Sequence, residues 1–172
     1  MIADDSWLHA LTEALAWACF VAGAALRFWA TLYIGGRKER VLVVDGPYSL
    51  CRHPLYLGSL LLGVSAGLFF ESPATLLALL VVATVYMRST VPIEEAVLRA
   101  RHQDAFDAYA AFVPRWWPRR LKVRTPAEIT VDVRKLWLEC ARASRWAWLP
   151  AVGLALRYVR TLGWLPRLLR VP

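Results

Sequence analysis

The chain has 172 residues, of which 58% are hydrophobic, and its mean hydropathy is +0.41. This length suits one domain, but the apolar share exceeds that of ordinary soluble domains, so a membrane protein is predicted. A net charge of +8 would suggest nucleic acid in a soluble protein. Here the cations flank apolar runs, which indicates membrane lipids as partners and no nucleic acid. The three cysteines are far apart and form no C-x-x-C, so neither a disulfide framework nor a metal site is predicted.

Three apolar segments predict about three transmembrane helices in an all-α integral membrane protein. The first covers about 7–34, and at 1.5 Å per residue it can cross a hydrocarbon core of about 30 Å. The second and third cover 55–70 and 74–90. The turn between them, 71–73, is too short for anything but a tight helical hairpin.

A polar loop precedes the second segment. Residues 41–53 begin with a mostly β-branched apolar run and continue into the turn signal Asp45-Gly46-Pro47, so we expect an ordered loop with a short extended piece. Pro54 suits the first turn of the next helix, where its missing N–H costs nothing.

A separate helix is predicted over 91–112, lying at or just off the membrane on the cytosolic side. Thr90 is its expected N-cap, and Glu94 and Glu95 fall in its first turn, where the helix dipole favours anions.

The predicted hairpin returns the chain to the membrane face from which it left. His53 and Tyr56 should therefore lie close to Arg88 and Glu94. Carboxylates and aromatic rings together attract onium groups, so this cluster suits a ligand with cationic and apolar parts.

The C-terminal part, 126–172, is interpreted as a basic amphipathic extension of a core that covers 1–125. Residues 126–143 are amphipathic, and 146–170 are apolar but interrupted by prolines and arginines. The segment 146–170 suits either a fourth span or an interfacial helix. We favour interfacial helices, because arginines are costly at lipid depth.

Loop charges predict the orientation. The loops 35–54 and 115–124 are rich in Lys and Arg, whereas the 71–73 turn has none. The positive-inside rule therefore places both polar clusters on the cytosolic side. We expect a multi-pass protein, in a bacterial inner membrane, with a cytosolic active site.

Three sequence pieces together resemble a known family. Residues 26–32 contain an arginine and a tryptophan late in a membrane helix, 42–58 read LVVDGPYSLCRHPLYLG, and 94–114 hold an acidic pair followed by spaced aromatics and Val113-Pro114. In this order, over roughly 20–118, they resemble the isoprenylcysteine carboxyl methyltransferase and phospholipid methyltransferase group of integral-membrane enzymes.

The resemblance implies methyl transfer from S-adenosyl-L-methionine to a membrane-embedded or lipid-like acceptor. It implies His53, Arg88 and Glu95 as catalytic candidates, with Arg88 standing in for a family arginine that aligns at Thr90. The positions it implies for the methyl donor are Arg40, Val41, Leu42, Val43, Tyr48, His53, Pro54, Leu55, Tyr56 and Glu94.

The acceptor and the oligomeric state stay open at this stage. A carboxylate acceptor is ionised at neutral pH and needs no base, whereas an amine would need one, such as His53 or Glu95. An apolar thiol or acid is a further possibility. Two alternatives to a methyltransferase are a sterol-reductase-like enzyme that binds NADPH and a non-catalytic membrane scaffold. Leu55 and the Glu94-Glu95 pair favour the methyltransferase.

Overall fold

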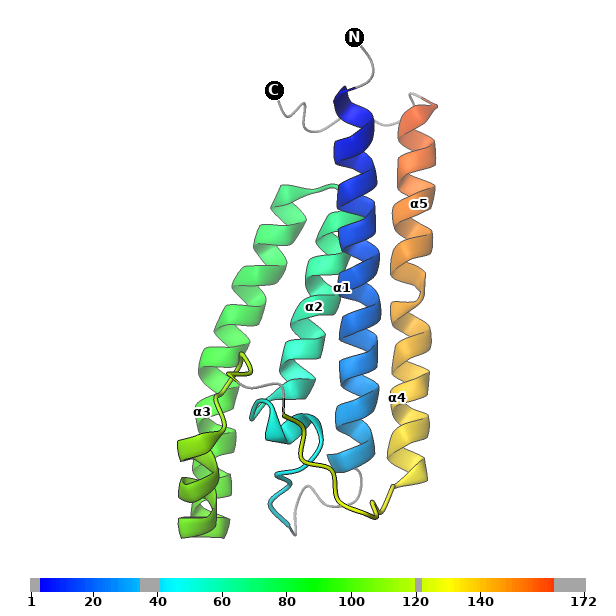
Figure 1. Cartoon of the computed structure of the whole chain (residues 1–172). Coiled ribbons are helices and arrows are strands. Elements are labelled where there is room, and N and C mark those ends of the chain that lie inside the picture. Colours follow the sequence, from blue (N-terminus) through cyan, green and yellow to red (C-terminus); the bar gives the residue numbers. More distant parts are fainter. Residues whose placement is uncertain (1–3, 35–40, 120–121, 163–172) are drawn as a thin grey trace.

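The computed structural model describes residues 4–34, 41–119 and 122–162, and these parts are helical without any strand (Figure 1). In chain order the elements are α1 (Asp4–Ile34), the 3-10 helix η1 (Pro47–Ser49), α2 (Pro54–Phe69), α3 (Pro73–Phe112), α4 (Val133–Trp146) and α5 (Trp148–Thr161). The all-α prediction is confirmed for these residues.

The centre of the fold is a close contact between α1 and α2. A Cβ on Gly23 would lie 2.8 Å from the carbonyl oxygen of Gly58, and one on Gly58 would lie 2.7 Å from Arg27 Cγ. Two glycines that face each other let the helix backbones approach, which is how membrane helices commonly pack. This contact fixes the start of α2 beside the second half of α1.

The predicted hairpin joins α2 to α3. Ser72 caps α3, accepting a hydrogen bond from the Thr75 backbone N–H at 3.2 Å, and Pro73 occupies the first turn. Among the described helices, α1 (from Trp7) and α3 are long and apolar enough to cross a membrane, while α2 is shorter. Large apolar side chains are exposed along the first half of α3: Leu77, Leu80, Val81, Val82 and Val85.

The expected helix start at Thr90 is wrong. The helix continues through Pro92, and the non-helical residue lies further along at Gln103, whose φ is 41°. Proline has a helical φ but no backbone N–H. Pro92 therefore removes one hydrogen bond from the helix, and the helix continues past it. The turn at Gln103 folds the last part of α3 back (Figure 1).

The C-terminal helices α4 and α5 follow one another and run antiparallel to α1 in Figure 1. Gly153 of α5 packs against Phe69 at the far end of α2, where a Cβ would lie 2.7 Å from Phe69 Cβ. Trp17 of α1 contacts the same ring edge-on, with centroids 5.3 Å apart. Within the segment 146–170, for which the sequence predicts an interfacial helix, α5 packs against the end of α2. Residues 163–172 of that segment lie outside the described parts.

Candidate active site

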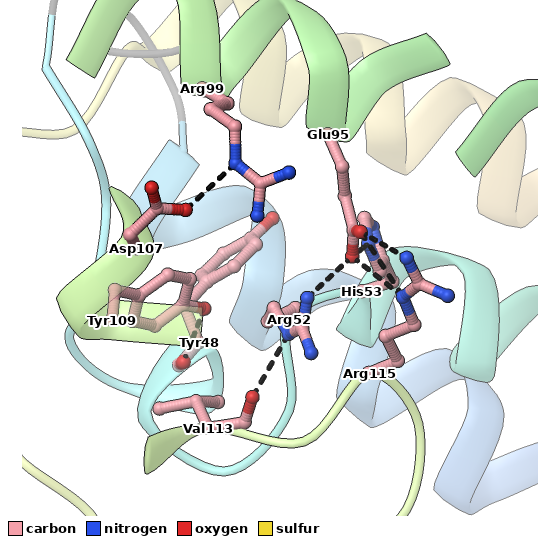
Figure 2. Close-up of polar contacts among 9 residues, drawn as sticks. All are labelled: Tyr48, Arg52, His53, Glu95, Arg99, Asp107, Tyr109, Val113 and Arg115. Atoms are coloured by element: carbon pink, nitrogen blue, oxygen red, sulfur yellow. Dashed lines mark hydrogen bonds and ion pairs between the residues drawn. The ribbon is translucent and has the colours of Figure 1, made fainter. Parts of the chain in front are cut away.

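An ionic cluster joins α3 to the start of α2. Glu95 is 8% exposed, and its carboxylate accepts hydrogen bonds from Arg52 Nη1 at 2.8 Å and Arg115 Nη2 at 2.6 Å. His53 Nε2 lies 3.1 Å from the same carboxylate. Figure 2 shows the three side chains gathered around Glu95. A buried carboxylate is stable only with such partners, so Glu95 determines how α3 sits on the loop.

The segment after α3 closes over this cluster. The Arg52 backbone N–H donates to the Pro114 carbonyl at 2.9 Å. Its Nε donates to the Val113 carbonyl, also at 2.9 Å (Figure 2). The Trp116 ring lies against His53 with centroids 5.6 Å apart. His53 is therefore held from both sides and is only 5% exposed.

The loop before α2 is ordered by its own turn and by two outside contacts. Gly46 adopts φ 60°, and a Cβ there would collide with the Tyr33 ring at 2.5 Å, so this position requires glycine. Its N–H donates to the Arg124 carbonyl at 2.7 Å, and Tyr109 Oη donates to the Tyr48 carbonyl at 2.8 Å. The expected ordered loop is confirmed, with a 3-10 turn at its end and an isolated bridge instead of a strand.

A cavity of about 470 Å³ lies between this loop, α2 and α3. The volume is in the range of small-molecule sites. One part of its wall is apolar and aromatic, and another carries Arg52, His53, Glu94 and Arg101. Glu94 accepts a hydrogen bond from Tyr56 Oη at 2.9 Å. The full lining is Ile34, Val41, Leu42, Val43, Tyr48, Arg52, His53, Tyr56, Thr90, Ile93, Glu94, Val97, Leu98, Arg101, Phe106 and Tyr109.

Tyr48 supplies the clearest sign of a ligand. Its side chain lines the cavity and is 6% exposed, yet its hydroxyl has no hydrogen-bond partner among the described residues. Burial is the main reason that the pKa of Tyr48 lies well above its ordinary value, so the phenol remains neutral and can donate. A buried polar group without a partner is costly, and a bound ligand would satisfy it.

His53 is neutral at physiological pH. Burial lowers its pKa below the ordinary value of 6.5, against the opposite influence of Glu95 and Glu94. A neutral ring donates from only one nitrogen, and the Glu95 carboxylate can only accept. Nε2 therefore carries the hydrogen, and Nδ1 keeps a lone pair that can accept a proton.

The structure brings together most of the residues implied for the donor, but not all of them. Pro54 is buried at the helix start, and Leu55 packs against the cluster of Ala30, Tyr33 and Tyr48; neither lines the cavity. Arg40 lies outside the described residues. The residues that do line it are Val41, Leu42, Val43, Tyr48, His53, Tyr56 and Glu94.

The catalytic candidates separate in the same way. His53 lines the cavity, whereas Glu95 is occupied by its ion pairs and does not. Arg88 is exposed on α3 and is absent from the cavity wall, and Thr90 is present in it. The expected proximity of Glu94 to Tyr56 is confirmed, but the proximity of Arg88 is not.

Several lining residues escaped the sequence interpretation. Ile93, Val97 and Arg101 recur every four residues from the position before Glu94, which is the spacing of one helix face. That periodicity could have identified them. No local signal marks Arg115 as a partner of Glu95, because only the turn at Gln103 brings the two together.

Comparison with known proteins gives one family model and two relatives. Residues 11–105 match the family model described as phospholipid methyltransferase. The nickel-cobalt-cadmium resistance protein NccN of Alcaligenes xylosoxydans xylosoxydans is 33% identical over 169 residues, which cover 98% of this chain and 79% of that protein. The cobalt-zinc-cadmium resistance protein CzcN of Cupriavidus metallidurans is 34% identical over 130 residues, or 76% of this chain and 60% of that protein. No solved structure matches the chain.

Proposed function

Because this chain belongs to the phospholipid methyltransferase family of membrane methyltransferases, we propose that its cavity binds S-adenosyl-L-methionine and that the protein methylates a lipid-like acceptor. The unsatisfied hydroxyl of Tyr48 in the cavity wall is the observation that carries this proposal. The donor would supply a methyl group bound to a positively charged sulfur. When the acceptor attacks the methyl carbon, the carbon–sulfur bond would break and the sulfur would leave as a neutral thioether.

The chain's residues fit that donor. The apolar wall formed by Leu42, Val43 and Val97 suits a flat base, and Tyr48 can donate to a polar atom of the ligand. Glu94 can pair with a cationic group of the donor, and Arg101 can pair with the carboxylate of the donor. The wall therefore offers a complementary group for each part of the molecule.

The proposed chemistry asks mainly for positioning and exclusion of water. The Trp116 ring covers His53, and the ionic cluster around Glu95 fixes the ring plane. If the acceptor is an amine, Nδ1 of His53 takes the proton that the new N–C bond releases. If the acceptor is a carboxylate, no proton moves and His53 only shapes the site. Glu95 acts as a positioning residue in both cases.

A membrane arrangement follows from the same proposal. We place α1, α2 and α3 across the bilayer with the site at the cytosolic interface, and α5 beside α2 as a fourth crossing. Cysteine labelling tests this in a variant without the native cysteines. Single cysteines at Ser72 and Lys122 should react with impermeant maleimide from opposite sides, and labelling from the same side would refute the arrangement.

Calorimetric titration of S-adenosyl-L-methionine into the purified chain in detergent tests the function. Saturable binding is expected for the wild type and for Glu128→Gln, which alters an exposed carboxylate outside the cavity. Binding should be lost in Glu94→Gln and weakened in Tyr48→Phe. Saturable binding of NADPH instead would favour a reductase, and binding of neither would favour a scaffold.

Radiolabelled methyl transfer into native membranes identifies the acceptor. Extraction of the product separates lipid amines from carboxyl esters, since only the esters release label in mild base. The two relatives are named as metal resistance proteins. The strain that provides the native membranes can therefore also be challenged with nickel and cobalt. If methylation supports resistance, Glu94→Gln, which should not bind the donor, should abolish both label and resistance.

A further inference from the structure

A second cavity, of about 340 Å³, lies between α1, α2 and α4 and shares no lining residue with the first. Most of its wall is apolar, with Phe20, Leu62 and Trp146 among the residues; the polar lining residues are Arg27, Glu139 and Ser144. Two small residues, Ala143 of α4 and Ala147 just after it, leave the space open. The family match at 11–105 does not reach α4, so this chamber involves a region with no assigned role.

A charged group stands at this chamber. Arg27 Nε donates to Glu139 Oε1 at 2.6 Å, and Arg27 Nη1 donates to Ser59 Oγ. Arg142 Nη1 donates to the other Glu139 oxygen at 3.2 Å. Glu139 is 3% exposed, whereas about half of the Arg142 side chain is exposed. Two arginines thus face one carboxylate, and the cluster keeps one net positive charge on its accessible side.

The position along α1 shows how a ligand would lie. Arg27 is about 10 Å from the end of α1 that contacts the candidate active site, and Phe20 is about 10 Å further from that end. The charges therefore lie nearer the membrane surface and the apolar walls lie deeper. An amphiphile with its head outward and its tail inward has this polarity.

We propose that this chamber binds one acyl chain of a phospholipid with an anionic headgroup, whose phosphate lies against Arg142. Basic pockets between membrane helices attract anionic headgroups, and an apolar chamber at this depth is accessible to lipid tails. The bound lipid fills the space between α4 and the core.

Fluorescence quenching tests the proposal with the full chain in phosphatidylcholine nanodiscs. Dibrominated phosphatidylglycerol is added in rising mole fraction, and the Trp146 signal is the difference between wild type and Trp146→Phe. Quenching should saturate at low mole fraction, and brominated phosphatidylcholine should require at least fivefold more. Quenching that rises in proportion to mole fraction for both lipids would overturn the proposal.

Matched variants separate the chamber from general lipid contact. Ala143→Leu fills the chamber and should lower the apparent affinity at least fivefold, whereas Ala141→Leu, on the exposed side of α4, should not. Arg142→Gln should remove the preference for phosphatidylglycerol, and Arg134→Gln, exposed near the start of α4, should retain it. Equal quenching in each pair would refute the assignment. If Ala143→Leu does not fold, the Arg142 and Arg134 pair decides alone.

Discussion

Two buried carboxylates organise the molecule, and each is bound by two arginines. Glu95 ties α3 to the loop before α2 through Arg52, and to the segment after α3 through Arg115. Glu139 ties α4 to α1 through Arg27, with Arg142 on its other oxygen. The chemistry is nearly the same, but Glu95 also holds a histidine in the wall of a cavity that carries further charged side chains, whereas Glu139 borders a cavity with a mainly apolar wall. A buried ion pair therefore does not by itself identify a candidate reaction site. The side chains that line the neighbouring cavity distinguish the two regions.

The largest expected effect is at the first carboxylate. Glu95→Gln leaves Arg52 and Arg115 without their counter-charge, and we expect a loss of about 3 kcal/mol in stability, because breaking a buried pair strands a charge. Donor affinity should fall about tenfold or more as His53 loses its orientation. Denaturation in detergent and calorimetry measure the two effects. Unchanged donor affinity would contradict the positioning role.

The second carboxylate should affect stability alone. Glu139→Gln leaves Arg27 without its ion pair between helices, so a loss of about 3 kcal/mol is again expected. Donor affinity should equal that of the wild type, since no residue of this cluster lines the first cavity. The same two measurements apply. Weaker donor binding here would mean that the two regions are coupled, and the comparison would fail.

A smaller effect is expected at the cavity wall. Tyr48→Phe removes a hydroxyl that has no partner among the described residues, so stability should hold or rise slightly. Donor affinity should fall about five- to tenfold, the value of about one hydrogen bond. Tyr109→Phe serves as the contrast, because it removes a bond to the Tyr48 carbonyl and should cost stability. The proposed donor contact is refuted if Tyr48→Phe binds as well as the wild type.

The smallest effect is a pH dependence from His53. Its pKa in the folded protein lies below 6.5, so the stability that the buried neutral ring contributes is complete above pH 6.5. That contribution is lost as the pH falls through the lowered pKa. Melting temperatures between about pH 7.5 and pH 5 should decline more in the wild type than in His53→Gln. Parallel curves would show that folding does not shift the pKa of the ring.

The two regions also differ in how far the sequence predicted them. The hairpin, the proline start of α2 and the meeting of Tyr56 with Glu94 followed from apolar runs and a three-residue turn. The expected break at Thr90 failed, because a proline is compatible with the interior of a helix that other contacts hold in place. In the C-terminal part, the density of arginines predicted a surface helix. The ion pair of Arg142 with Glu139 and the packing of Gly153 against Phe69 have no local sequence signature, so the sequence did not predict them.

The sequence alone determined a helical membrane protein with a polar motif at the start of its second apolar helix, because hydrophobic runs, turn residues and motif spacing act over short distances. Only the tertiary structure decided which groups bond to one another. It paired Glu95 with Arg115 through the turn at Gln103, left the Tyr48 hydroxyl without a partner in the cavity wall, and kept Arg88 outside that wall. It also joined Arg27 to Glu139 across 112 residues of sequence. These contacts depend on where whole helices pack, which no local pattern encodes.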